Sequence, residues 1–297
     1  DVLKAAAELG YRPNLLARSL TTRRTNIVGL VVDEMENPNI LQVLDGVTKR
    51  LQRRGYMSML LNIATDDSHH SALSLADQFQ VDGLIFLGTL LNDELLQLAQ
   101  EIRNIPLIVL YRNSDNPNIH VVTTDGYQAG IEIACLFAEQ GYRRIGYMSG
   151  PHSESTQLKR LEGFRDGLEA KGIAVGPILQ AGHYQRPSGF RAMNRYLDGT
   201  PPHERIEAIF CENDILAFGA LDAMRTRAES TSIAVVGFDD IELAATPCYD
   251  LTTYSQPLDI LVNEAIRRLT SEDRSPSRFL APGTLVLRTS HLRKQST

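Results

Sequence analysis

The sequence predicts an α/β protein that contains two doubly wound parallel-sheet subdomains. Three observations lead to this fold class. Short apolar segments alternate with amphipathic segments, several amphipathic segments end in glycine directly before the next apolar segment, and the pattern is repeated along the chain. A βαβαβ alternation of this kind is typical of parallel sheets with helices on their faces.

The strand candidates are continuous apolar runs, which indicates strands covered on both faces. They are residues 27–32, 57–62, 83–88, 107–111, 145–149, 207–211 and 233–237. The helix expected over residues 40–54 has apolar side chains at spacings of four and three: Ile40, Leu44, Val47 and Leu51. Glycine allows a helix to end sharply in the left-handed conformation, and we expect this at Gly55, Gly141 and Gly172.

The strand pattern occurs twice. The first half extends from Ile27 to about Thr123, and the second begins with a helix after Asp125. Two such halves create a cleft, and ligands of parallel sheets bind beyond the carboxyl ends of the strands. We therefore expect ligand-binding residues in the loops that follow residues 32, 88, 111, 149, 211 and 237.

Composition indicates an ordinary folded protein. Of 297 residues, 43% are hydrophobic and 22% are charged, and no apolar run approaches the roughly 20 residues of a bilayer-spanning helix. We find no signal peptide, and the sequence starts without methionine, so we expect an upstream segment. The cysteines Cys135, Cys211 and Cys248 are far apart, so we interpret them as buried thiols of a cytoplasmic protein.

Charge is distributed unevenly along the chain. Residues 1–24 contain five basic and two acidic side chains, a net charge of +3. Since the whole chain carries −6, the remainder carries −9 and repels phosphate. Any contact with nucleic acid is therefore expected at the N-terminus, where a cationic segment leads directly into the first strand. The alternative is an exposed tail whose charges only keep it solvated.

The loops that follow the strands are rich in polar side chains. They contain Asp33, Asn37, Asn39, Tyr111, Arg112, His152, Glu212, Asn213, Asp214, Asp239 and Asp240, with Arg160 and Tyr184 nearby in the sequence. Carboxylate, amide and guanidinium groups form paired hydrogen bonds with neighbouring hydroxyls, and an aromatic ring covers an apolar face of a sugar or base. The pattern suits a small polar metabolite. Two alternatives remain open, helix capping for Asn213 or Asp214 and turn formation for Asp239 or Asp240.

Sequence signatures of catalysis are absent. The chain has no GxGxxG, GxxxxGK, GxSxG or HExxH motif. The pair His69-His70 lies in a polar loop that enters a helix, and we expect it to be solvated rather than to form a metal site. We therefore predict no enzyme activity, no cofactor and no metal.

Over essentially its entire length, the chain resembles the LacI/GalR family of bacterial transcription regulators. The matching segments are GYRPNLLARSL (10–20), VDGLIF (81–86), TTDGYQAG (123–130), RLEGF (160–164), CENDILAFGAL (211–221), VVGFDDI (235–241) and LTTYSQP (251–257). The resemblance implies a type I periplasmic-binding-protein-like fold with a remnant DNA-binding headpiece and a hinge helix at the N-terminus. It divides the chain into the last headpiece helix (1–13), hinge helix and linker (14–25), an N-terminal effector-binding subdomain (26–123 plus 256–282) and a C-terminal one (124–255 plus 283–297).

The resemblance assigns DNA contacts to the hinge. Residues 17–20, ARSL, resemble a helix that becomes ordered on operator DNA and inserts a leucine, here Leu20, into the minor groove. Ala17 belongs to the same helix, and Arg18 and Arg23 are expected to neutralise backbone phosphate. The helices that read the major groove would lie upstream of this sequence.

For the effector, the family pattern matches Arg160, Asn213 and Asp239, and also Tyr184 and Gln256. By analogy Arg160 and Asp239 hold the polar edge of the ligand, Asn213 binds a hydroxyl, and Tyr184 stacks. Two further positions depart from the pattern. Tyr111 stands where the family often has Asp, and Asn39-Ile40 stand where an aromatic pair is common.

We therefore expect a repressor whose ligand-binding domain senses a small metabolite, a sugar or sugar derivative, and allosterically alters operator binding. A two-fold operator requires a homodimer, with a tetramer as the larger alternative, and helices 40–54 and 70–80 are the candidate interface. The alternative function is a periplasmic-type solute-binding protein of the same fold.

Overall fold

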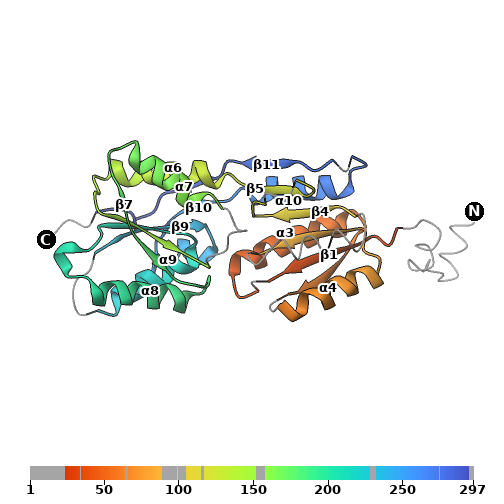
Figure 1. Ribbon diagram of the computed structural model, residues 1–297, viewed down its shortest axis with the longest axis horizontal. Coiled ribbons are helices and arrows are strands. Elements are labelled where there is room, and N and C mark those ends of the chain that lie inside the picture. Colours follow the sequence, from red (N-terminus) through yellow and green to blue (C-terminus); the bar gives the residue numbers. More distant parts are fainter. Residues whose placement is uncertain are drawn as a thin grey trace, which may run out of the picture.

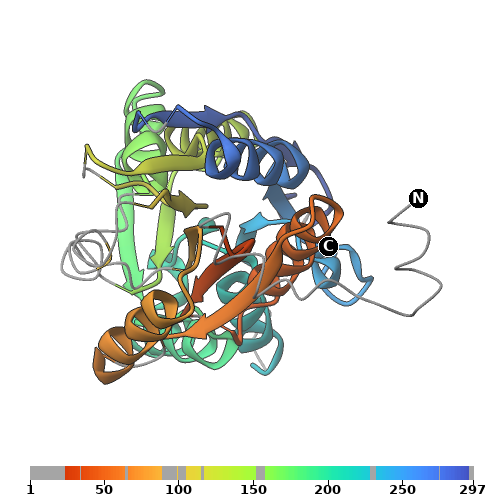
Figure 2. The same cartoon turned by 90° about the vertical axis from the view of Figure 1, so that its right-hand side faces the viewer.

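The computed structural model describes residues 24–33, 35–63, 66–88, 99, 105–114, 117–151, 158–227, 232–273 and 275–293, with only the backbone of 66–69. Two lobes lie side by side along the long axis of the molecule (Figure 1). Each lobe contains a six-stranded sheet with helices on both faces, as Figure 2 shows from the end. The predicted fold class, two doubly wound α/β lobes, is thereby confirmed.

The first sheet is entirely parallel and has the order β11-β5-β4-β3-β1-β2. Its strands are β1 (Ile27–Val32), β2 (Met57–Asn62), β3 (Gly83–Leu87), β4 (Leu107–Leu110), β5 (His120–Thr124) and β11 (Arg278–Ala281). Val28, Leu30 and Val32 pack in one core with helices α3 (Pro38–Arg53) and α10 (Leu258–Thr270). Ile27 and Val31 face the opposite core, beneath α4 (Asp66–Gln78).

The second sheet repeats this order as β12-β10-β9-β8-β6-β7, with β12 antiparallel to β10. Its strands are β6 (Ile145–Ser149), β7 (Val175–Gln180), β8 (Ala208–Cys211), β9 (Ala234–Asp239), β10 (Thr252–Ser255) and β12 (Thr284–Val286). Helices α6 (Gly126–Glu139) and α7 (Arg160–Glu169) cover one face, and α8 (Arg186–Gly199) and α9 (Asp214–Arg225) cover the other. Short 3₁₀ turns occupy Pro202–Glu204 and Glu242–Ala245.

The helices of each pair approach so closely that glycine backbones touch. A Cβ atom added to Gly130 of α6 would lie 2.3 Å from the carbonyl oxygen of Arg160, and one added to Gly163 of α7 would lie 1.9 Å from that of Tyr127. Gly189 and Gly219 make the same kind of contact between α8 and α9. These contacts fix the start of α7, and therefore the backbone of Arg160.

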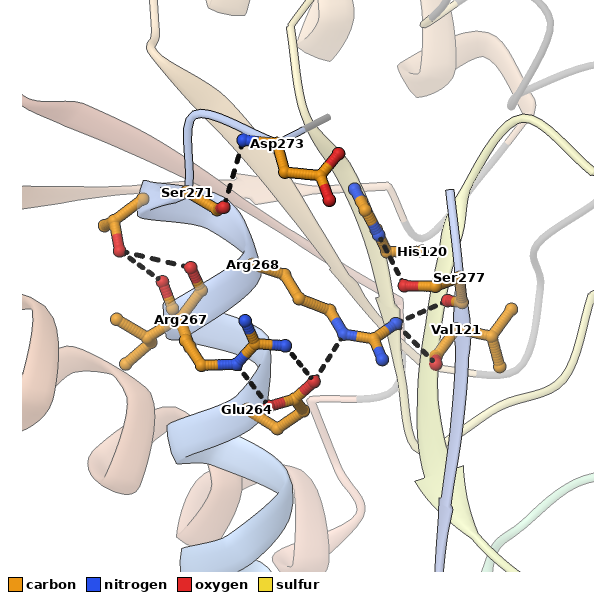
Figure 3. Close-up of polar contacts among 10 residues, drawn as sticks. His120, Val121, Glu264, Arg267, Arg268, Ser271, Asp273 and Ser277 are labelled. Atoms are coloured by element: carbon orange, nitrogen blue, oxygen red, sulfur yellow. Dashed lines mark hydrogen bonds and ion pairs between the residues drawn. The ribbon is translucent and has the colours of Figure 1, made fainter. Parts of the chain in front are cut away.

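The chain crosses between the lobes three times: after β5, between β10 and α10, and between β11 and β12. β11 is held in the first sheet by Arg268 of α10, which is bonded to the carbonyl oxygens of Ser277 and Val121 and to Glu264 (2.7 Å). His120, at the start of β5, lies beside Ser277 in the same cluster (Figure 3).

The structure confirms the expected glycine C-termini, since Gly55, Gly141 and Gly172 have φ angles of 79°, 79° and 69°. Other expectations were wrong. β2 is not covered on both faces but leaves Met57 and Leu60 exposed, because it is an edge strand. The His69-His70 segment lies within α4, and Cys248 is exposed and receives a hydrogen bond from Arg225 (3.5 Å).

Candidate functional site

A cleft of about 410 Å³ lies between the two lobes, beyond the carboxyl ends of the strands. This is the position expected for a ligand of two parallel sheets. Its lining consists of Asn37, Asn39, Ile40, Gly88, Tyr111, Arg112, Leu158, Arg160, Tyr184, Asn213, Asp239 and Gln256. The cleft therefore brings together all seven residues that were expected to bind an effector: Asn39, Tyr111, Arg160, Tyr184, Asn213, Asp239 and Gln256. The DNA-binding candidates Ala17, Arg18, Leu20 and Arg23 lie outside the described residues.

Among the lining residues that the structure describes, Asp239 is the only acidic one. It ends β9 with a φ angle of 119°, a strained conformation for a residue with a side chain. Burial raises the pKa of its carboxyl to about 7, although Arg160 and a hydrogen bond from Gln256 oppose this shift. A ligand that donates hydrogen bonds to Asp239 would stabilise its charged form.

Gln256 joins the two lobes at the cleft. Its Nε2 donates to Asp239 of the second sheet (2.7 Å), and its Oε1 accepts from Thr124 Oγ1 at the end of β5 in the first sheet (2.7 Å). Gln256 itself lies on the second chain crossing, between β10 and α10. The amide of Gln256 therefore links Asp239 to the first lobe, and its NH₂ group has a second N–H beside the one that Asp239 accepts.

Arg160 begins α7 and is 7% exposed. Its guanidinium carbon lies 3.4 Å from the ring centroid of Phe238, and its Nη1 donates to the carbonyl oxygen of Glu212. Stacking and hydrogen bonding together hold the planar guanidinium in one orientation at the wall of the cleft. Such a group can form paired hydrogen bonds with neighbouring oxygens of a ligand.

Asn213 is both a helix cap and a lining residue. Its Oδ1 accepts from the backbone N–H of Leu216 (3.0 Å), so capping, one of the two interpretations of this position, is confirmed. The side-chain NH₂ remains as the donor with which Asn213 can reach a ligand. Asp214 does not line the cleft; its buried carboxylate accepts from Thr253 Oγ1 (2.5 Å) and Ile241 N (3.0 Å).

The first lobe contributes the loop after β4 and the start of α3. Tyr111 has a φ angle of 66°, and burial, together with the charges of Asp239 and Asp259, raises the pKa of its hydroxyl, which stays protonated. Arg112 is 1% exposed. Asn37 caps α3 by accepting from the backbone N–H of Asn39 (3.1 Å).

Several features of this region were not predicted. Gly88 and Leu158 complete the lining without a polar group that would have identified them. Glu212 was noted as a polar loop residue but was given no role, and its carboxylate accepts from three groups, described below. A hydrogen bond from Gln185 to Glu36 (2.8 Å) also connects the two lobes.

The chemistry of the cleft is that of binding. Amides, two guanidiniums, one carboxylate and two phenol rings surround it. Within the described part of the chain, no three His, Cys, Asp or Glu side chains gather as a metal-binding group, and no helix is long and apolar enough to cross a bilayer. Two parallel-sheet lobes with a polar cleft between them define a protein of the two-lobed ligand-binding class.

Comparison with known proteins identifies the family. The chain belongs to the family described as "Periplasmic binding proteins and sugar binding domain of LacI family", whose model matches residues 25–258. Among curated proteins, it is 31% identical over 275 residues to the HTH-type transcriptional repressor PurR of Klebsiella pneumoniae subsp. pneumoniae, covering 90% of this chain and 79% of the repressor. PurR of Escherichia coli O139:H28 is 32% identical with the same coverage.

Solved structures of similar fold are also transcription regulators. The transcriptional regulator CelR in complex with cellobiose has a TM-score of 0.78 at 28% identity, covering 97% of this chain and 89% of CelR. A LacI family regulator from Enterococcus faecium with bound ribose has a TM-score of 0.76 at 19% identity, covering 91% and 100%, and supports the fold alone. The chain is accordingly a LacI-family, ligand-sensing regulator of transcription, and these relatives are regulators rather than enzymes. A solute-binding role is not favoured.

Proposed function

We propose that a small sugar or sugar derivative binds in the cleft between the lobes and thereby alters the affinity of the protein for operator DNA. The observation that carries this proposal is the arrangement of Asp239, Gln256 and Arg160, which present a carboxylate, an amide and a guanidinium in one cleft. Adjacent hydroxyls of a sugar fit such paired donors and acceptors. CelR, which binds cellobiose in its solved structure, supports the ligand class.

Each of six lining residues has an assigned role in this proposal. The carboxylate of Asp239 accepts a hydrogen bond from one sugar hydroxyl, and the guanidinium of Arg160 donates a hydrogen bond to another. Asn213 adds its NH₂ group, and the ring of Tyr184 covers an apolar face of the sugar. Tyr111 and Asn39 approach from the first lobe, so closure of the lobes would complete the contacts.

The experiment is a thermal-shift screen of the chain against free sugars, sugar acids, nucleosides and purines. A ligand that binds the folded state stabilises it by RT ln(1 + [L]/Kd), about 2.7 kcal/mol at a hundredfold excess over Kd. We expect a sugar to raise the unfolding midpoint, and Arg160→Ala or Asp239→Ala to weaken its binding by about 1.5–3 kcal/mol each. Wild-type affinity in both variants would disprove the site.

For the DNA side, we propose that the hinge of residues 14–25 contacts the operator, with Leu20 as the wedge beside Ala17, Arg18 and Arg23. In a protein that carries its complete headpiece, Leu20→Ala should lose operator affinity in a gel-shift assay, because the unstacking contact is removed. Effector affinity should be unchanged in the same variant. Unaltered DNA binding would refute the assignment of Leu20 as the wedge.

We also propose a cytoplasmic location, because a bacterial regulator must reach its operator DNA.

We further propose that the protein acts as a homodimer through the first lobe. Large apolar side chains are exposed on α3, on the edge strand β2 and in and after α4: Leu41, Met57, Leu60, Leu75 and Phe79. They fall on the two predicted helices and on the strand between them, and exposed apolar patches mark interaction surfaces. Sedimentation should show a dimer that Leu60→Glu dissociates; a monomeric wild type would contradict the proposal.

A further inference from the structure

We propose that Glu212, which does not line the cleft, is a positioning residue that holds Tyr184 and Arg160 in the orientations needed for effector binding. This inference rests on the proposed effector site. Glu212 follows β8 directly and precedes the capping residue Asn213. Its side chain is turned toward three other segments of the second lobe and not toward the cleft.

The carboxylate of Glu212 accepts three hydrogen bonds. Oε1 accepts from the hydroxyl of Tyr147 (2.9 Å), and Oε2 accepts from the backbone N–H of Gly150 (2.6 Å) and the hydroxyl of Tyr184 (2.9 Å). Tyr147 lies within β6, Gly150 in the loop after β6, and Tyr184 between β7 and α8. One side chain therefore ties together three segments, through bonds that its negative charge strengthens.

These bonds determine where the ring of Tyr184 lies. A Cβ atom added to Gly150 would be 2.1 Å from Cε1 of that ring, so the ring rests directly on the Gly150 backbone. The hydroxyl proton is committed to Glu212, and the ring is 8% exposed at the cleft wall. Tyr184 consequently offers a ligand its ring surface, and the ring is held from two sides.

The backbone of Glu212 acts on Arg160. Its carbonyl oxygen accepts from Nη1 of Arg160, and its N–H donates to the carbonyl oxygen of Met148 in β6 (2.9 Å). The carboxylate of Glu212 is a third hydrogen-bonded group of this residue, beside its carbonyl oxygen and its N–H, and helps to hold it in place. Loss of the carboxylate would therefore loosen the acceptor of Arg160 as well as the ring of Tyr184.

Holding lining side chains before the ligand arrives improves affinity, because their ordering no longer opposes binding. If the carboxylate is removed, both Tyr184 and Arg160 must be ordered during binding. We expect effector affinity to fall on the order of tenfold. Tyr147 keeps its proton and remains a donor, since burial and the nearby charge of Glu212 raise the pKa of its hydroxyl.

The chain offers a matched control at the other end of the same strand. Glu207 precedes β8, and its carboxylate accepts from the backbone N–H groups of Arg143 (2.9 Å) and Arg144 (3.0 Å) and from Arg293 (2.6 Å). It is a hydrogen-bonded glutamate of the same lobe that does not line the cleft. Glu207→Ala therefore removes a comparable carboxylate without touching Tyr184 or Arg160.

The experiment compares Glu212→Ala, Glu212→Gln, Tyr184→Phe and Glu207→Ala in the 297-residue chain. Amide hydrogen exchange of Gly150 and of residues 183–186 reports on positioning without a ligand. Isothermal titration with D-ribose, D-glucose, D-galactose and cellobiose, each used separately, reports on affinity. Tyr184→Phe removes only the hydroxyl and tests the same contact if Glu212→Ala does not fold.

We expect Glu212→Ala to speed exchange at Gly150 and at 183–186 and to weaken sugar binding about tenfold, whereas Glu207→Ala does neither. Glu212→Gln, which keeps a side-chain acceptor, should lie between Glu212→Ala and the wild type. Exchange or affinity in Glu212→Ala equal to that of Glu207→Ala overturns the proposal. If no sugar binds the wild type, the sugar assignment fails, and the exchange measurement alone decides the role of Glu212.

Discussion

The substitution Gly130→Ala in α6 tests whether α6 and α7 are in direct backbone contact. A Cβ atom there would lie 2.3 Å from the carbonyl oxygen of Arg160 and 2.5 Å from the backbone nitrogen of Phe164. Real Cβ contacts are essentially never shorter than 3.0 Å, so in Gly130→Ala the two helices must separate. Backbone atoms cannot rotate away from the methyl group as a flexible side chain would.

The expected cost follows from this geometry. Overpacking of a closely packed core costs about 1–3 kcal/mol, and alanine regains up to about 1 kcal/mol of helix propensity over glycine. We expect Gly130→Ala to be destabilised by roughly 1–2 kcal/mol, and its unfolding midpoint to fall by several degrees, at roughly 2–4 °C per kcal/mol for a chain of this size. Because the contact is with Arg160, sugar affinity should fall too.

Urea unfolding and calorimetry measure the stability, and isothermal titration measures the affinity. The control is Gly199→Ala at the end of α8, where an added Cβ meets nothing within 4 Å and the φ angle is not positive. This variant should be neutral or slightly more stable than wild type. If Gly130→Ala is as stable as Gly199→Ala, α6 and α7 are not in backbone contact and the reasoning is refuted.

Three further results are expected. Because burial raises the pKa of Asp239 to about 7, the contribution of this residue to the stability of the ligand-free protein falls as the pH rises from about 4 to about 7, so Asp239→Asn should raise the unfolding midpoint more at pH 8 than at pH 5. Arg268→Met should cost about 3 kcal/mol in urea unfolding, since it removes the buried partner of Glu264 and releases β11, whereas exposed Arg267→Met should change little (Figure 3). Burial and Arg268 lower the pKa of His120, so the contribution of this residue to stability should fall as the pH drops below about 6.5. His120→Gln should therefore remove that contribution, and the gain in stability over wild type should be larger at pH 5 than at pH 8.

The sequence predicted the architecture because its central strands are long apolar runs between amphipathic helices. β5, β7, β10 and the two C-terminal strands were not predicted. They are short, polar or, in β7 (VGPILQ), interrupted by glycine and proline, and they become strands only through their neighbours. The segment TTYS of β10 illustrates this, since Thr252 and Thr253 are fully buried between β9 and β12. Tertiary contacts override local preference there.

The lining of the cleft was predictable where polar residues follow strands, as at Asn213 and Asp239. The role of Glu212 was not, because it depends on Tyr147, Gly150 and Tyr184, which are separated by up to 65 residues from their shared acceptor. The exposure of Cys248 escaped prediction for a similar reason. Its sequence neighbours suggested a buried thiol, and only the folded structure shows that this side chain lies at the surface.

The three crossings of the chain between the lobes also have a consequence for biosynthesis. The sheet that starts with β1 receives its last strand, β11, only at residues 278–281, after the whole second lobe except β12 has been made. The first sheet is complete only after residue 281 and the second only after residue 286. The earlier lobe must therefore wait, with an unpaired edge at β5, while most of the later one is synthesised. We therefore expect the two lobes to reach their native state almost together, late in translation, and a stop codon before β11 to leave neither sheet complete.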